Sequence, residues 1–445
     1  FVLIITVLST VGLETSKFNN LITQKINSAN KNINLELKSV KYKFDIKELS
    51  LFLDTKDPNI NYRKVSIPAK NIKVYIDFPS LINVSPQIKK INITLNQIEI
   101  EQLKSLSVSF KPSTFTSFLN NNILKGKLNT EIEVFLDKNN TLDNFIARGS
   151  VENLEAKIFN NFNLNKTNFS FFADKTDILV KKFSSELGPL KIEKGDVQVK
   201  FLSEISIISN FQSILKGENI FKYYPNLIEN YTYLNDISKI EAKLSNSLNL
   251  SLDKTYKIKK YSFKSTGNIV NTVLNFNSPI ESNYIKDSVE NLSLRNSKFE
   301  TNINSKKIVT KISGEYSINK STYLSFNLEN EKIDKLYKTN LLADYEKDLN
   351  FDIINYKKKE GKIAKILINL EKYNSKTKFN KINFTENKNS FVIEGLKFEN
   401  EKFKSIEKIL VQTFKNDRKN NDFLIEFGKK ILIRGSQFDA TNFVK

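Results

Sequence analysis

The chain of 445 residues contains no Cys, no His, no Met and no Trp. Without Cys it can form neither a disulfide nor a thiolate metal site, and without His it lacks the usual general base and the commonest metal ligand. Serine–histidine and cysteine–histidine catalytic arrangements are therefore impossible, and neither common glycine-rich nucleotide motif occurs. The sequence predicts no catalytic residue, no metal site and no cofactor, so an enzyme is the least favoured class.

Glycine and proline are also scarce, at 12 and 8 residues, and no Gly-, Pro- or Ser-rich linker divides the chain. A chain of this length could hold two or three ordinary domains. The missing linkers favour one long, continuously growing β structure instead. The absence of Met leads us to expect that the natural protein begins upstream of Phe1, and no terminating signal precedes Lys445.

Positive charge is in excess. The chain has 69 Lys and Arg against 49 Asp and Glu, which gives a net charge of +20. Only five of the basic residues are Arg, the side chain best suited to phosphates and guanine edges. These are Arg63, Arg148, Arg295, Arg418 and Arg434. The lysines fall mostly on outward strand positions and in turns, which indicates a solvated surface with at most a weak attraction to anionic membranes. No nucleic-acid partner is expected.

What the sequence does contain is a period of two between apolar residues, clearest from Gly126 to Phe201. This period places one residue type on each face of a strand, so it predicts a succession of half-buried antiparallel strands separated by polar turns. Apolar residues at helical spacing interrupt it after Lys111, at Phe115, Phe118, Leu119 and Ile123. A second short helix is expected between Leu227 and Ile237.

These patterns divide the chain into seven segments. They are a partial transmembrane anchor at 1–13, an amphipathic helix at 14–28, an N-terminal β segment at 29–111, a short helix at 112–125, a central β segment at 126–202, a mixed segment with a short helix at 203–250, and a C-terminal β segment at 251–445.

The first 13 residues, FVLIITVLSTVGL, carry no charge but are shorter than the roughly 20 residues of a membrane span. They are interpreted as the distal end of a transmembrane helix. A signal-peptide core and a buried helix are the alternatives, although no clear A-x-A-like cleavage pattern follows. The helix after it carries Phe18, Leu21, Ile22 and Ile26 on one side.

A sheet of so many strands has an apolar face that two or three short helices cannot cover. The predicted fold is mainly β, a long curled antiparallel sheet with an open apolar groove that suits acyl chains. The alternative is an ordinary dry β core. The residues predicted to line the groove are Ile72, Val74, Ile76, Ile91, Ile93, Leu95, Leu128, Ile132, Val134, Leu154, Ile158, Phe169, Phe171, Val197, Val199 and Phe201.

The order of features resembles the AsmA-like family of bacterial envelope proteins, in particular its YhdP-like branch. The resemblance rests on the two N-terminal segments, on an entry region and on a closing phrase. The entry region comprises NLELKSV (34–40), LSLFL (49–53), KVSIPA (64–69), VYID (74–77) and PSL (79–81), and the closing phrase is IRGSQFDA (433–440). The element YYP (223–225) is a looser likeness.

This resemblance implies a protein anchored in the inner membrane by its N-terminal helix, with its bulk in the periplasm. It implies a taco-shaped β-sheet whose apolar trough conducts phospholipid toward the outer membrane. Phospholipids, the inner membrane and other periplasmic or outer-membrane proteins would be its partners. No cofactor or catalytic residue is implied.

Two other classes of protein are weighed against this one. A structural or assembly protein of the cell envelope would have the same strands around a closed core. An outer-membrane barrel is also built on period-two strands, but the apolar N-terminal segment and the lack of aromatic girdles argue against it.

Overall fold

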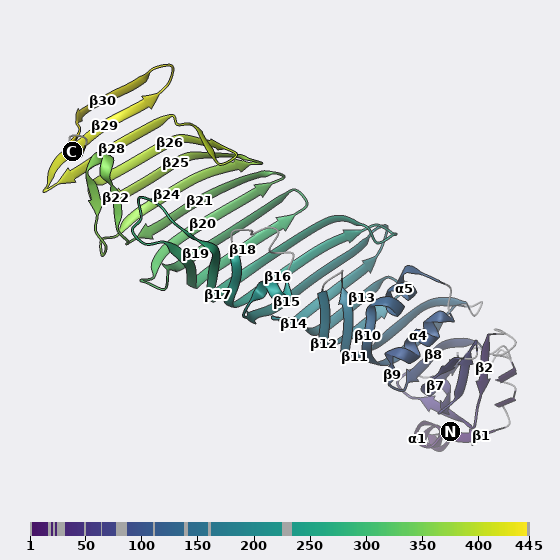
Figure 1. The fold of residues 1–445 in the computed structure, drawn as a ribbon. Coiled ribbons are helices and arrows are strands. Elements are labelled where there is room, and N and C mark those ends of the chain that lie inside the picture. The colour runs from purple at the N-terminus through teal and green to yellow at the C-terminus, as the bar shows by residue number, and fades with distance from the viewer. Residues whose placement is uncertain are drawn as a thin grey trace. The chain divides into compact units, whose positions relative to one another are not determined.

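The computed structural model of the protein describes residues 2–16, 19–20, 23–24, 32–48, 50–63, 65–76, 87–109, 112–137, 141–158, 162–224 and 234–442. The fold is mainly β and the strand pairs are antiparallel, which confirms the predicted class (Figure 1). The chain forms two compact units. Unit 1 comprises Phe1–Phe211 with Ser251–Lys257, and unit 2 comprises Gln212–Leu250 with Ile258–Lys445.

Unit 1 is built on short strands followed by long ones. Its elements are α1 (Val2–Thr10), β1 (Leu13–Thr15), β2 (Ile33–Glu36), β3 (Val40–Asp45), β4 (Ser50–Lys56), β5 (Asn59–Tyr62), β6 (Val65–Ile67), β7 (Ala69–Ile76), β8 (Ile88–Leu95), β9 (Ile98–Glu99), α4 (Ile100–Val108), α5 (Thr114–Asn122), β10 (Ile123–Leu136), β11 (Leu142–Ile158), β12 (Phe162–Asp174), β13 (Asp177–Leu187) and β14 (Leu190–Phe201). The strands β15 (Ile205–Gly217) and β16 (Leu234–Leu252) have residues in both units.

The main sheet of unit 1 is an antiparallel succession in which most strands pair with their neighbours in the sequence. Its order is β1–β3–β4–β7–β8–β10–β11–β12–β13–β14, and β9 continues the pairing of β8 with β10. The strands β2, β5 and β6 form a small separate sheet. A short polar turn joins β12 to β13, where Asp174 Oδ1 accepts hydrogen bonds from the Thr176 and Asp177 amides.

Helices α4 and α5 interrupt the strands of unit 1. The expected helix at 112–125 is present as α5, where the Ser113 hydroxyl accepts a hydrogen bond of 3.1 Å from the Thr116 amide. The other helix, α4, corrects the prediction, because Ile100, Leu106 and Val108 were assigned to strands. Their alternation coincides with the helical spacing of Ile100, Leu103 and Leu106, and the Glu99 amide donates to Gln102 Oε1 at 3.3 Å in a capping box.

At the N-terminus the structure differs in part from the expected anchor and helix. Residues 2–10 form α1, but Leu13–Thr15 is a strand paired with β3. Phe18, Leu21, Ile22 and Ile26, which define the predicted amphipathic helix, lie outside the described residues. In the described part of the chain, no helix has both the length and the apolar character needed to cross a membrane. The anchor therefore stays a prediction.

Unit 2 continues with longer strands. Its elements are α6 (Ile220–Tyr223), β17 (Ile258–Ile280), β18 (Val289–Asn304), β19 (Lys307–Ile318), β20 (Leu324–Ile333), β21 (Leu336–Tyr345), β22 (Leu349–Phe351), the 3-10 turn η2 (Asp352–Ile354), β23 (Tyr356–Lys358), β24 (Ala364–Tyr373), β25 (Lys376–Glu386), β26 (Asn389–Glu399), β27 (Lys402–Ser405), β28 (Lys408–Lys415), β29 (Arg418–Phe427) and β30 (Ile431–Gln437). The antiparallel order is β17–β18–β19–β20–β21–β24–β25–β26–β28–β29–β30, with β27 also paired to β26.

Two features of this part were not expected from the sequence. The helix predicted between Leu227 and Ile237 is wrong at its end, because Leu234 and Ile237 belong to β16, while residues 225–233 are outside the described part. The only helix that the described residues form near there is the single turn α6. In addition, β22, η2 and β23 form a small hairpin that is inserted between β21 and β24. We call Leu349–Lys358 the inserted hairpin.

Candidate functional site

The apolar residues of unit 1 line up across neighbouring strands on one face of the sheet. Residues directly opposed in antiparallel strands point to the same face. One row, from β7 to β14, consists of Ile72, Ile93, Ile132, Ala147, Ala173, Ile178 and Val199. A parallel row consists of Val74, Ile91, Val134 and Phe145. The register thus brings together predicted groove residues that are up to 127 positions apart, since Val199 is 127 residues after Ile72.

The other predicted residues extend these rows. Leu128 lies opposite Val151, which in turn lies opposite Phe169. Phe171 is linked in the same way through Val180 to Val197. Between β7 and β8, Ile76 lies opposite Ile88 and Leu95 lies opposite Ala69. Between β11 and β12, Ile158 lies opposite Phe162 and Leu154 lies opposite Thr167. Phe201 follows Val199 by two positions on β14.

Four of the predicted residues are half-buried and pack against clusters of buried side chains. Ile72 and Leu95 pack against the cluster of Leu35, Ile60 and Ala69, which the small sheet covers. Leu154 and Ile158 pack against a second cluster, which joins α4 and α5 to β10, β11 and β12. Its buried members are Ile100, Leu119, Ile123, Ala156 and Leu164. In these two clusters the apolar face of unit 1 is covered by other elements of the unit.

None of the sixteen predicted residues is buried. Phe201 is exposed, and the other fifteen are only half-buried, although all of them are apolar. The opposite face carries ion pairs such as Lys181 with Asp196 at 2.8 Å and Arg148 with Glu131 at 3.7 Å. The sheet of unit 1 is therefore amphipathic, and its apolar face is covered only in part.

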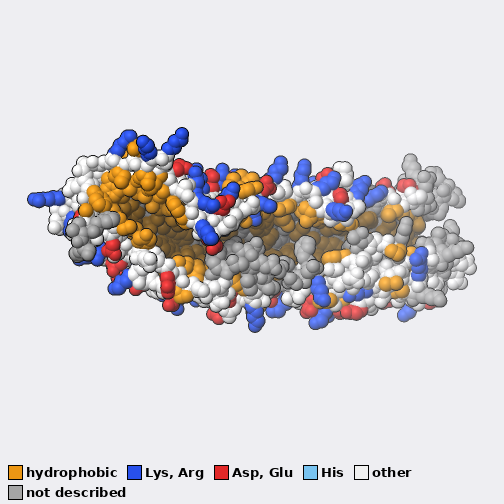
Figure 2. Space-filling model, turned by 45° about the horizontal axis from the view of Figure 1, so that its top comes forward, with side chains coloured by type: hydrophobic (Ala, Val, Ile, Leu, Met, Phe, Trp, Pro, Cys, Tyr) orange, Lys and Arg blue, Asp and Glu red, His pale blue; other side chains and the backbone are white. Residues whose placement is uncertain are grey.

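In unit 2 the apolar rows are longer and richer in aromatic residues. One row from β19 to β30 consists of Ile312, Leu328, Leu341, Ile368, Ile382, Ile393, Ile409, Ile425 and Ile433. The neighbouring row consists of Phe326, Ala343, Ile366, Phe384, Phe391, Val411 and Phe423. Figure 2 shows the hydrophobic side chains of this unit gathered in a hollow at the left end of the view.

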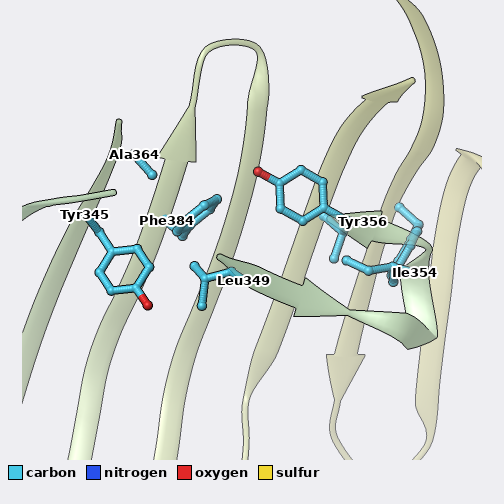
Figure 3. Close-up of a cluster of buried hydrophobic side chains, with 8 residues drawn as sticks. Tyr345, Leu349, Ile354, Tyr356, Ala364 and Phe384 are labelled. Atoms are coloured by element: carbon cyan, nitrogen blue, oxygen red, sulfur yellow. The ribbon is translucent and has the colours of Figure 1, made fainter. Parts of the chain in front are cut away.

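The inserted hairpin packs over part of this apolar face. Leu349, Ile354 and Tyr356 are buried together with Phe384 in the largest cluster of unit 2 (Figure 3). The rings make the closest contacts, with centroids 4.8 Å apart for Tyr356 and Phe391 and 5.2 Å apart for Phe351 and Phe391. Such aromatic pairs contribute beyond the burial of their area. The hairpin therefore turns one stretch of the open face into a partly closed compartment.

That compartment is a cavity of about 790 Å³ between the inserted hairpin and strands β25, β26, β28, β29 and β30. Its size is within the range of pockets that hold small-molecule ligands. Its walls are Tyr284, Phe351, Asp352, Ile353, Ile354, Ile382, Phe384, Phe391, Ile393, Ile409, Val411, Phe423, Ile425, Ile433 and Phe438. Among these, only Asp352 is charged. We call this space the apolar cavity.

A polar network fastens the inserted hairpin to β28 and β29. Asn421 is fully buried, and its amide nitrogen donates to the Ile354 carbonyl at 2.8 Å and to Thr413 Oγ1 at 2.7 Å. Its amide oxygen accepts from the Asp439 backbone amide at 2.9 Å. One side chain thus joins the hairpin, the sheet and the C-terminal segment, and the two bonds that its amide nitrogen donates are buried.

Asp439 completes this network from the C-terminal side. Its carboxylate accepts hydrogen bonds from the Thr441 hydroxyl and amide, from Asn420 Nδ2 at 3.1 Å and from Asn355 Nδ2 at 2.9 Å. These bonds, led by that of the Thr441 hydroxyl, hold the pKa of the carboxyl far below its ordinary value. The closing phrase IRGSQFDA therefore has a structural role here, since Phe438 also meets Phe423 with centroids 5.4 Å apart.

No protein-family model, curated protein or solved structure significantly matches this chain. The AsmA-like resemblance thus stays a prediction, and the geometry of the two apolar faces carries the functional argument. In the part of the chain that the structure describes, no three carboxylates gather closely enough to hold a metal ion.

The residues of the apolar cavity were not selected from the sequence. The alternation at Ile366, Ile368, Leu370, Phe379, Ile382 and Phe384 indicated strands, but nothing in it distinguished a covered stretch from an open one. The available signal was the break of this pattern between Tyr345 and Ala364, a short apolar insertion bearing Leu349, Phe351, Ile354 and Tyr356. Such an insertion within a run of hairpins has to pack against one face of the sheet.

Proposed function

We propose that this protein binds the hydrocarbon chains of phospholipids on the apolar faces of its sheets and conducts lipid between the inner and outer membranes. The proposal places its bulk in the periplasm, held by the N-terminal segment in the inner membrane. The observation that carries it is the set of apolar residues opposed across strands but only half-buried in unit 1. Each Å² of apolar surface removed from water contributes about 25 cal/mol, so an acyl chain laid along these rows is stabilised.

Further support comes from the exposed apolar surface of α1, where Leu3 and Ile4 are 76% and 60% exposed. An isolated nine-residue helix with such a surface is unfavourable in water. Membrane insertion of this segment would remove these side chains from water. The taco-shaped trough expected from the AsmA-like resemblance agrees with an amphipathic antiparallel sheet whose apolar face is incompletely covered.

A matched pair of substitutions on β12 tests the open face of unit 1. Phe171 lies opposite Val180 in the apolar rows, whereas Phe172 is the next residue and faces the other side, 40% exposed. We expect Phe171→Glu to carry less co-purifying phospholipid than Phe172→Glu, since a carboxylate among hydrocarbon costs several kcal/mol, while lipid held in the apolar cavity of unit 2 is retained. Phe172→Glu should leave the amount of bound lipid unchanged. Native mass spectrometry after gentle purification measures the bound lipid.

Two results would instead favour a structural or assembly protein of the cell envelope. A wild-type chain that carries no lipid, or a Phe171→Glu variant that retains as much lipid as Phe172→Glu, would contradict the proposal. A structural or assembly role in the envelope would then account better for the fold.

A further inference from the structure

A second, polar pocket lies beside the apolar cavity of unit 2. It has a volume of about 380 Å³ and is lined by Asn283, Tyr284, Ile285, Lys286, Asp348, Leu349, Asn350, Lys357, Lys358 and Lys359. Four of these ten residues are lysines and one is an acid. We call this space the lysine pocket.

Tyr284 lines both spaces and forms their shared wall. The segment that carries it is tied to the inserted hairpin, because Ile285 and Leu349 form a β-bridge and the Asn350 amide donates to the Tyr284 carbonyl at 3.1 Å. Its ring lies 5.4 Å from that of Phe351, centroid to centroid. Tyr284 is 53% exposed, and it is the residue at which the linings of the lysine pocket and the apolar cavity meet.

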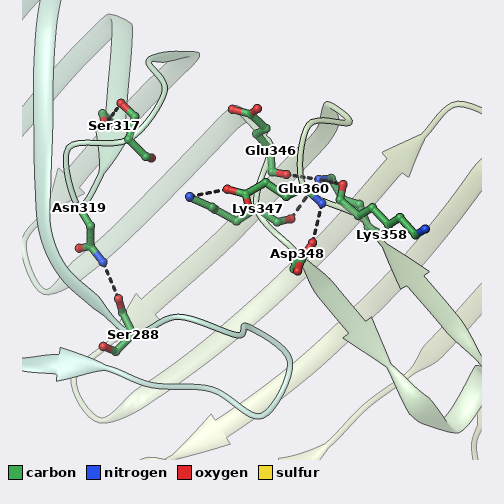
Figure 4. Close-up of polar contacts among 10 residues, drawn as sticks. Ser288, Ser317, Asn319, Glu346, Lys347, Asp348, Lys358 and Glu360 are labelled. Carbon is green, nitrogen blue, oxygen red and sulfur yellow. Dashed lines mark hydrogen bonds and ion pairs between the residues drawn. The ribbon is translucent and has the colours of Figure 1, made fainter.

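The acidic groups around the lysine pocket are already engaged. The Asp348 carboxylate accepts from the Glu360 backbone amide at 2.5 Å, and Glu360 pairs with Lys347 at 2.6 Å (Figure 4). The hydrogen bond to Glu360 raises the pKa of Lys347, and the negative charges of Asp287 and Glu346 add to this shift. The negative charge of Glu360 is thus offset by Lys347, and one oxygen of Asp348 is held by a backbone amide.

Those three lysines, Lys286, Lys357 and Lys359, are exposed. Within the described residues, none of them forms an ion pair with a carboxylate within 4.0 Å. The fourth, Lys358, is 2% exposed and donates to the backbone carbonyls of Glu346, Lys347 and Lys359, the last two at 3.0 and 3.3 Å. Its amino group is thus the buried member of the pocket lining. The pocket as a whole is therefore an attractive site for an anion.

We propose that the two spaces form one composite site for an amphiphile with an acidic head group. The hydrocarbon chain would fill the apolar cavity, pass Tyr284, and place a phosphate or carboxylate against Lys286, Lys357 and Lys359. This inference rests on the proposed function and makes it more specific, because it assigns a head-group preference to one place along the chain. The site would hold an anionic lipid more tightly than a neutral one of equal chain length.

The test compares two probes that differ only in the head, dodecyl phosphate and dodecanol, each titrated below its aggregation limit into the full chain by calorimetry. We expect dodecyl phosphate to bind about tenfold more tightly than dodecanol at low salt, and this advantage to shrink as salt screens the lysines. The triple variant Lys286→Gln, Lys357→Gln, Lys359→Gln should lose the advantage and bind dodecanol as the wild type does. A matched triple at other exposed lysines of unit 2, Lys306→Gln, Lys335→Gln, Lys372→Gln, should keep the advantage.

Each other outcome has a distinct meaning. Equal binding of both probes would overturn the head-group inference and leave the proposed function standing. Binding of neither probe would overturn both. Inorganic phosphate that binds as tightly as dodecyl phosphate would assign the lysine pocket to a free anion, and so would overturn the composite site.

Discussion

Ile409→Glu is expected to reduce the binding of a hydrocarbon probe to the apolar cavity of unit 2 by at least about tenfold, since a carboxylate there would lose its water and find no partner. Ile409 lies on β28 between Ile393 and Ile425 and forms part of the cavity wall. The only charged residue of that wall is Asp352, which is itself an acid and cannot neutralise the new charge. Dodecanol binding measured by calorimetry reports the loss directly.

The neighbouring residue supplies the control for this prediction. Leu410 is 38% exposed, lies opposite Val392 and Leu424, and faces the other side of the same strand. Leu410→Glu adds the same charge at nearly the same place in the fold, but it should leave dodecanol binding within about twofold of the wild type, because its carboxylate stays in water. Equal loss in the two variants would show that the charge acts on the fold instead of on the cavity, and would remove the support for this site.

Asn421→Ala should produce the largest change in local stability. The substitution removes the partner of the Ile354 carbonyl and of the Asp439 amide, and it leaves Thr413 Oγ1 with its bond to Asn420 alone. Unsatisfied buried groups cost about 1–3 kcal/mol each, of which water entering the gap recovers a part, so we expect a loss of about 3 kcal/mol. Hydrogen exchange of the amides in Leu349–Lys358 measures it, because it follows the opening of the inserted hairpin separately from global unfolding.

An exposed asparagine of the same unit serves as the comparison. Asn327 on β20 faces water, and Asn327→Ala should change the exchange of the inserted hairpin by less than about 0.5 kcal/mol. If Asn421→Ala left the exchange of Leu349–Lys358 unaltered, the other contacts of the hairpin would be sufficient to hold it. In that case the network of Asn421 and Asp439 would not control access to the apolar cavity.

These predictions depend on features that differ in how far the sequence revealed them. The alternation at Leu128, Ile132 and Val134 predicted a strand with one apolar face, and the register with β8 and β11 agrees with it. Such a pattern can be recognised within one strand, because successive side chains point to opposite faces and the apolar ones mark the face that is turned from water. Helix α4 was missed because a period of two and a period near four share several positions over nine residues, so that its apolar residues fit both.

The sequence by itself determined the chemistry of this protein's surfaces. It excluded histidine and cysteine chemistry, predicted antiparallel strands with one apolar face each, and indicated that few helices are present to cover them. These properties follow from the composition and from the spacing of apolar residues two to four positions apart. That spacing determines which side chains share a face of a strand or a helix.

The tertiary structure alone decided which parts of the apolar faces are closed. It placed Leu154 and Ile158 under α4 and α5, left Phe171 and Val197 half-buried, and folded the inserted hairpin over Phe384 and Phe391. Covering a face requires contacts between segments that are distant in the chain, as when Asn421 bonds to Ile354, 67 residues away. The free energy of such contacts depends on how well the side chains fit together and on how far apart they lie in space. The spacing of residues along the chain contains neither piece of information.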